Sequence, residues 1–170
     1  MKSKKIFKAT FLVMVITIAS RFLGLIRDSL VAYYFGAGAI TDAYKAAVMV
    51  PETLFTIIGL GVSTVFIPML SKIRYRDSKE KMFEFANNVI GLLIIMSLCI
   101  FVLGNIFTES IVNIIAPGFS KENMELAISL TRISLINLLF MSVNVCFLSM
   151  LQVCEDFVIP SILGMFFNAP

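Results

Sequence analysis

The chain has 170 residues, of which 59% are hydrophobic, and it contains 16 Phe, 10 Met and no Trp. Its mean hydropathy of +0.95 excludes a soluble domain of ordinary composition and predicts an all-α, polytopic membrane helix bundle. The net charge of +3 is small, and the basic residues do not alternate with exposed aromatics on one face, which argues against nucleic-acid binding.

The first predicted membrane span covers residues 6–35 and is longer than the roughly 20 residues that cross a bilayer. Polar residues recur in it every three or four positions, so on a helix they share one face. Charged residues at membrane depth cost about 2.5 to 3.5 kcal/mol each and usually face a bundle interior or a water-filled cavity. We therefore predict a cavity-lining first stripe, made of Thr17, Ser20, Arg21, Gly24, Arg27 and Asp28.

The second predicted span covers residues 42–70 and follows a tight turn at residues 36–39. Thr41 is predicted to cap this helix, with Asp42 in the first turn, where a negative charge suits the helix dipole. Pro51 removes a backbone hydrogen bond, so we expect a kink near residues 47–51. A second stripe, predicted to face the first, consists of Asp42, Lys45, Met49, Glu52, Thr53, Thr56 and Ser63.

The remaining chain alternates between charged or turn-forming segments and apolar runs. Residues 71–84 are rich in charge and predict a solvated loop or a short surface helix, and residues 85–115 form the third predicted span. A type II turn is expected at residues 116–119, followed by Ser120 as a helix cap. The fourth span covers residues 124–153, whose small polar residues are typical of helix-to-helix contacts. The fifth apolar run, residues 157–170, is about ten residues short of a crossing.

The distribution of basic residues predicts the orientation in the membrane. Four lysines lie before or at the start of the first span and five Lys or Arg lie within residues 71–84, whereas the turn at 116–123 carries only Lys121 and the turn at 36–41 none. By the positive-inside rule, the N-terminus and residues 71–84 are cytoplasmic.

Enzymatic chemistry has little support in the sequence. There is no histidine, which excludes a histidine metal site or a histidine general base. Cys99, Cys146 and Cys154 lie in or beside apolar runs, so we interpret them as packing residues. No nucleophile–base pair, phosphate-cradling loop or metal-ligand cluster is found. We expect no enzyme activity, no metal and no cofactor.

Several short motifs follow one another along the chain: Ser20–Asp28, Phe35–Gly38, Thr41–Tyr44, Pro51, Phe66–Pro68, Ala116–Phe119 and Phe157–Pro160. In this order they resemble the MurJ-type (MviN-like) lipid II flippases of the multidrug/oligosaccharidyl-lipid/polysaccharide exporter superfamily. The resemblance implies that residues 1–170 are part of the N-terminal lobe of a two-lobed transporter in the bacterial cytoplasmic membrane. It implies alternating access of a cationic cavity, with an undecaprenyl-pyrophosphate-linked peptidoglycan precursor, membrane lipids and the transporter's remaining helices as partners.

The resemblance also implies roles for residues of the first stripe. Ser20, Arg21 and Arg27 match polar and cationic positions that line the family's cavity, and Asp28 matches the acid beside the second arginine. Arginine suits a pyrophosphate because its guanidinium offers forked donors and stays charged. We predict substrate binding by Ser20, Arg21 and Arg27, with Asp28 in gating or charge pairing; the alternative is that Asp28 only neutralises an arginine.

The second stripe departs from the family pattern. Asp42 matches the acid that opens the family's second helix, but Phe55–Thr56 stands where many members have an arginine. We predict that Lys45 binds substrate, and that Asp42 and Glu52 act in gating or charge pairing with it. Whether Lys45 replaces the missing arginine stays open.

Two other functions stay open. One is a related exporter of a polysaccharide-lipid or a drug, although an exporter of cationic drugs should carry acids rather than arginines in its cavity. The other is a truncated membrane protein that does not transport, because four complete spans cannot build two lobes.

Overall fold

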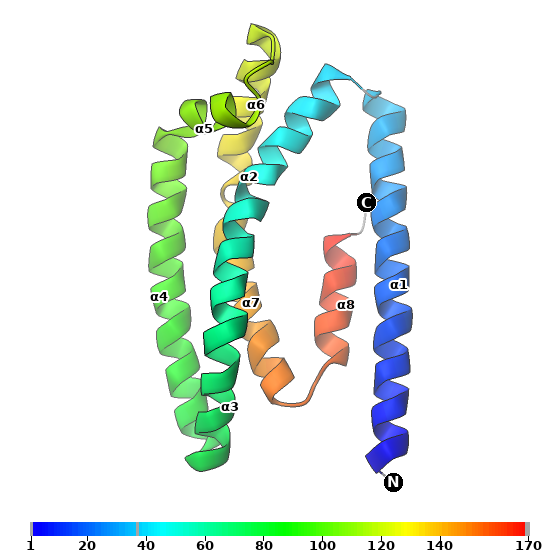
Figure 1. Ribbon diagram of the computed structural model, residues 1–170, viewed down its shortest axis with the longest axis vertical. Helices are drawn as coiled ribbons and strands as arrows, with labels where there is room; N and C mark the ends of the chain where they lie inside the picture. The colour runs from blue at the N-terminus through cyan, green and yellow to red at the C-terminus, as the bar shows by residue number, and fades with distance from the viewer. Residues whose placement is uncertain (1, 37, 169–170) are drawn as a thin grey trace. The chain divides into compact units, whose positions relative to one another are not determined.

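The computed structural model describes residues 2–36 and 38–168 (Figure 1). Regular structure in these residues is entirely helical, which confirms the all-α fold class. Four helical segments are long and apolar enough to cross a membrane: Thr10–Phe35, Ala39–Arg76, Lys79–Ile106 and Lys121–Val153. The chain divides into two compact units, Met1–Gly36 with Leu151–Pro170, and Ala37–Met150.

The first unit is built on the long helix α1 (Lys2–Phe35), against which the short helix α8 (Val158–Phe167) packs (Figure 1). Gly36 ends α1 with φ 74°, and its N–H donates to the Ala32 carbonyl at 3.0 Å. Glycine suits this left-handed end because it has no Cβ to clash. At the start of α8, the Asp156 carboxylate accepts from the backbone N–H groups of Val158 and Ile159 at 3.1 and 3.2 Å.

The second unit begins with one continuous helical stretch, made of α2 (Ala39–Gly61), the π-helical turn η1 (Val62–Phe66) and α3 (Ile67–Arg76). It extends the predicted span at both ends, and α2 contains Pro51 and bends along its length (Figure 1). The predicted cap was wrong: Gly38 is the N-cap and makes no side-chain bond, whereas Thr41 lies inside α2 and is buried. Ala37 of the predicted tight turn lies outside the described residues.

The charged segment at residues 71–84 is not a loop. Only Asp77 and Ser78 separate α3 from α4 (Lys79–Ile106), so most of the charges lie on the ends of two helices. Ser78 caps α4, because its hydroxyl accepts from the Lys81 N–H at 3.3 Å. Residues with good helix propensity together with this cap extend α4 into the polar region.

The third predicted span ends earlier than expected, because α5 (Thr108–Ile115) is a separate helix that turns away from α4 (Figure 1). The hydroxyl of Thr108 is fully buried at this bend and donates to the Gly104 carbonyl at 2.6 Å. A carbonyl at the end of α4 is thereby satisfied by a side chain.

A turn at residues 116–119 leads into the last helices of the second unit. The Phe119 N–H donates to the Ala116 carbonyl at 3.2 Å, but Gly118 lacks the positive φ that a type II turn requires, so the predicted turn type was wrong. Ser120 caps the next helix as predicted, accepting from the Asn123 N–H at 3.4 Å.

The fourth predicted span is two helices, α6 (Lys121–Ser134) and α7 (Asn137–Val153). Between them, the N–H groups of Ile136, Leu138 and Leu139 donate three residues back rather than four, at 3.1 to 3.3 Å. These are 3₁₀-type bonds, which tighten the backbone locally.

Small residues let the helices of the second unit approach closely. Ala43 of α2, Val112 of α5 and Ala127 of α6 form a buried cluster. The Ser97 hydroxyl of α4 donates to the Ser142 hydroxyl of α7 at 2.7 Å in a fully buried position. The expected role of small polar residues in joining helices is therefore confirmed for Ser142.

Candidate functional site

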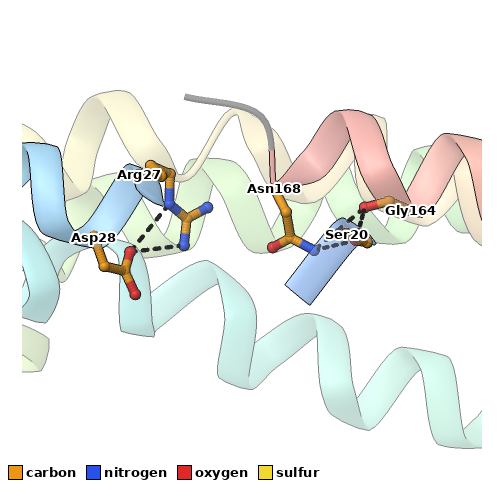
Figure 2. Close-up of polar contacts among 5 residues, drawn as sticks. All are labelled: Ser20, Arg27, Asp28, Gly164 and Asn168. Carbon is orange, nitrogen blue, oxygen red and sulfur yellow. Dashed lines mark hydrogen bonds and ion pairs between the residues drawn. The ribbon is translucent and has the colours of Figure 1, made fainter. Parts of the chain in front are cut away.

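The first stripe contacts α8 through Ser20, which is only 7% exposed. Figure 2 shows that the Ser20 hydroxyl donates to the Gly164 carbonyl at 3.2 Å and accepts from the Asn168 side-chain amide at 2.8 Å. The same amide also donates to the Gly164 carbonyl, at 3.3 Å. Three polar groups from two helices thus satisfy one another in an apolar part of the chain.

Gly24 makes room for this contact one turn along α1. A Cβ built at Gly24 would lie 3.4 Å from the Asn168 Oδ1 atom, with two further atoms of that side chain within 3.8 Å. Because Ser20 and Gly24 are both small and four residues apart, they form a shallow groove that accepts the Asn168 side chain.

Arg27 and Asp28 form the charged part of the first stripe (Figure 2). The Nε and Nη2 atoms of Arg27 lie 3.2 and 3.1 Å from the same oxygen, Oδ1 of Asp28. The two side chains are 39% and 68% exposed, and such surface ion pairs contribute only about 0 to 1 kcal/mol. The pair therefore orients the guanidinium more than it stabilises the fold.

Arg21 is exposed and makes no hydrogen bond or ion pair with the residues that the structure describes. A helix turns about 100° per residue, so Arg21 lies to one side of Ser20, while Arg27, seven residues on, returns to within roughly 20° of it. The first stripe is thus buried against α8 at Ser20, whereas its charged residues are exposed or partly exposed.

Part of the second stripe lines an open cleft of about 640 Å³ within the second unit. Asp42, Lys45 and Met49 of α2 form one wall, and the opposite wall comes from α5, the following turn and the start of α6. The full lining is Ala39, Asp42, Lys45, Ala46, Met49, Ile115, Ala116, Gly118, Phe119 and Asn123.

The charges of the second stripe are not paired with one another. Among the described residues, no ion pair joins Asp42 to Lys45 or Lys45 to Glu52. Glu52 is exposed and does not line the cleft. Thr53 and Thr56 donate to backbone carbonyls one turn back, at 2.8 and 2.9 Å. The side chain of Ser63 lies outside the described residues.

The two stripes belong to different units, and their facing one another stays a prediction. Chemically, the first offers arginines to a phosphate group, and the part of the second that lines the cleft offers one ammonium and one carboxylate beside apolar walls. In the described part of the chain, no group of three or more Cys, Asp or Glu residues could hold a metal ion.

Sequence reasoning missed Asn168. The fifth apolar run was interpreted only by its length, although an amide side chain close before Pro170 is unusual in such a run. A polar residue in an apolar helix needs a hydrogen-bond partner, and that requirement was the signal that could have pointed to Ser20.

Comparisons with known proteins agree with the motifs. The family model described as "Lipid II flippase MurJ" matches residues 31–169. The chain is 33% identical over 165 residues to the "Probable lipid II flippase MurJ" of Aquifex aeolicus (strain VF5), covering 96% of this chain and 32% of the relative. It is 36% identical over 166 residues to that of Buchnera aphidicola subsp. Baizongia pistaciae (strain Bp), with the same coverage.

A third relative is the "Lipid II flippase MurJ" of Thermosipho africanus (strain TCF52B), 36% identical over 120 residues, or 70% of this chain and 24% of the relative. The first two relatives match almost all of this chain. The chain itself spans about a third of their length, 32% in each case.

Proposed function

Because the chain belongs to the lipid II flippase MurJ family, we propose that it forms part of a flippase that moves a lipid-linked peptidoglycan precursor across the bacterial cytoplasmic membrane. The observation that carries this proposal is the family match over residues 31–169. Four apolar helical segments long enough to span a bilayer support a multi-pass membrane protein. Such a protein moves its substrate and makes or breaks no covalent bond in it.

In this proposal, Arg21 and Arg27 attract the pyrophosphate of an undecaprenyl-linked headgroup while the lipid tail stays in the bilayer. The two arginines are roughly 9 Å apart along the helix axis, so both can reach one extended diphosphate-sugar group. Arg21 is exposed and Arg27 is partly exposed beside Asp28, which supports the role. Acids repel phosphate, so Asp28 orients Arg27 rather than binding the ligand.

Lys45 is proposed to add a third positive charge to the cavity, with Asp42 and Glu52 acting in gating or charge pairing. The support for Lys45 is that it lines the cleft and, among the described residues, forms no ion pair with Asp42, which leaves its ammonium group for a ligand. Rocking of two lobes would expose the cavity to either side in turn. The lysines before the first span and the basic residues around Asp77 support a cytoplasmic N-terminus.

The proposal that Arg21 and Arg27 bind the pyrophosphate is tested by measuring lipid II binding to the purified chain in lipid nanodiscs. Each charge-assisted hydrogen bond contributes about 1.5 to 3 kcal/mol, so Arg27→Ala and Arg21→Ala should each raise Kd by roughly 10- to 100-fold. Arg132→Ala is the matched control, because it removes an exposed arginine from α6. If both stripe variants stay folded and bind as tightly as the control, the cationic site is refuted.

Transport is tested in a chimera in which residues 1–170 replace the matching third of the Aquifex aeolicus relative. Movement of fluorescent lipid II across proteoliposome membranes is expected in the unmodified chimera and in its Arg132→Ala variant. Loss in the Arg27→Ala chimera supports the mechanism, whereas undiminished transport removes Arg27 from it. Competition by other polyprenyl-pyrophosphate sugars distinguishes lipid II from the substrate of a related exporter.

A further inference from the structure

The end of α8 is completed by a residue of α1. Asn168 closes α8, and its backbone N–H donates to the Met165 carbonyl at 3.2 Å, three residues back. The Gly164 carbonyl, which the Asn168 N–H would bond in a regular α-helix, instead accepts from the Ser20 hydroxyl and the Asn168 amide. A proline follows at position 170, and proline has no N–H with which to continue the helical bonds.

The hydrogen bonds of Ser20 with Gly164 and Asn168 fix both the axial position and the rotation of α1 relative to α8. Ser20 meets two partners at once, and the Asn168 Oδ1 atom lies 3.4 Å from the position that a Cβ at Gly24 would occupy. A rotation of α1 by one residue, about 100°, would break both hydrogen bonds of Ser20. The same rotation would turn Arg21 and Arg27 away from their present directions.

We propose that Asn168 is a positioning residue for the arginines of α1: its amide holds Ser20, and through Ser20 it sets the direction in which Arg21 and Arg27 face. Asn168 itself need not touch the substrate. The inference rests on the proposed function for the role of the arginines, and on the hydrogen bonds of Ser20 for the link between the helices (Figure 2).

The link between α1 and α8 depends on the Nδ2 donor of Asn168 and not on the size of the Asn168 side chain. Asn168→Asp keeps the shape but removes the Nδ2 donor that binds Ser20 and Gly164. Ser20→Ala removes the hydroxyl. Ser161→Ala is the matched control, because the Ser161 hydroxyl donates to the carbonyl of Phe157, the N-cap of α8, at 2.8 Å and makes no hydrogen bond with α1 among the described residues.

The first measurement is the affinity of the full chain in nanodiscs for lipid II and for a phosphate-free polyprenol of the same length. Losing one such hydrogen bond corresponds to roughly a 2- to 12-fold change, so Asn168→Asp, Asn168→Ala and Ser20→Ala should weaken lipid II binding by that factor. Polyprenol binding should not change, because it does not use the arginines. Ser161→Ala should bind lipid II as the unmodified chain does.

The second measurement is amide hydrogen exchange at the C-terminal end of α8, around Gly164. Exchange should accelerate in Asn168→Asp and in Ser20→Ala but not in Ser161→Ala. Faster exchange with unchanged lipid II affinity would overturn the positioning role, as would an equal loss of lipid II and polyprenol binding. If Arg21→Ala and Arg27→Ala both leave lipid II binding intact, the proposed role of the arginines fails and positioning fails with it, while exchange still reports whether the contact exists.

Discussion

The close packing of α4 against the junction of α6 and α7 predicts a measurable steric coupling. A Cβ at Gly104 would lie 3.0 and 3.3 Å from the two methyl carbons of Leu135, well inside the 3.5 to 4.0 Å of a favourable carbon contact. Leu135 is fully buried, so its side chain cannot move into solvent. Gly104→Ala should therefore cost about 1 to 3 kcal/mol in overpacking, offset by about 1 kcal/mol of helix propensity.

The double variant separates overpacking from other effects. Leu135→Ala alone should lower the free energy of unfolding by about 2 to 5 kcal/mol because it leaves a cavity. In Gly104→Ala/Leu135→Ala the added methyl enters that cavity, so the double variant should be more stable than the sum of the single effects by about 1 to 3 kcal/mol.

The assay uses the chain's own thiols, because it contains no tryptophan. Cys146 is buried, whereas Cys99 and Cys154 are exposed. With Cys99 and Cys154 replaced by serine, reaction of Cys146 with a thiol-specific fluorogenic dye reports unfolding in detergent. Gly91→Ala in the same helix is the control, because a Cβ there meets nothing within 4 Å. Equal stability of Gly104→Ala and Gly91→Ala, or additive effects in the double variant, would refute the predicted clash.

Other contacts give further predictions. Ser142→Ala should destabilise more than Ser97→Ala in the same assay, about 1 to 3 against 0.5 to 1.5 kcal/mol, because only the first leaves a buried hydroxyl without its acceptor; equal losses would contradict this. Ser120→Ala should cost about 1 kcal/mol, as the loss of a helix cap does, and no change in the unfolding midpoint would exclude the cap's contribution. Gly24→Leu should displace Asn168 and accelerate exchange in α8, whereas Gly24→Ala, at a contact distance of 3.4 Å, should be tolerated. The 170 residues reconstituted alone should bind lipid II without translocating it in a fluorescent-lipid assay, and translocation would show that the second lobe is dispensable.

The helical fold class could be predicted from the sequence because apolar runs of membrane length leave few alternatives. Ser120 was correctly identified as a cap, since a serine that follows a turn and precedes a helix can accept a hydrogen bond from a free N–H of the first helical turn. Thr41 was not a cap, because it is buried inside the first turns of α2, and the helix began earlier, at a glycine. A polar residue near a helix start thus marks the region but not the boundary.

The junctions inside the apolar runs could not be predicted. Neither Phe107 nor the pair Leu135 and Ile136 carries a proline or glycine signal, so residues 85–115 and 124–153 were each interpreted as one helix. The junction of α6 and α7 has a partner that is distant in sequence, because Leu135 fits over Gly104 of α4. Tertiary contacts of this kind leave no local pattern.

The candidate site was predicted in part. Spacing by three and four placed the arginines on one helix, but it could not show that Ser20 is buried while the arginines stay exposed or partly exposed. The burial of Ser20 depends on Asn168, which is 148 residues from Ser20 in sequence. The cleft beside Asp42 and Lys45 is lined in part by residues of α5 and α6, which sequence spacing does not describe.

The 3₁₀-type bonds between α6 and α7 also affect how a rotation of one helix about its axis is transmitted to the other. A regular α-helix transmits rotation about its axis from one end to the other, whereas a tightened segment acts as a hinge. α6 packs against α2 and α5, and α7 is tied to α4 through Ser142. Rotation of α6 about its own axis would therefore be taken up near Ile136 before it reaches α7.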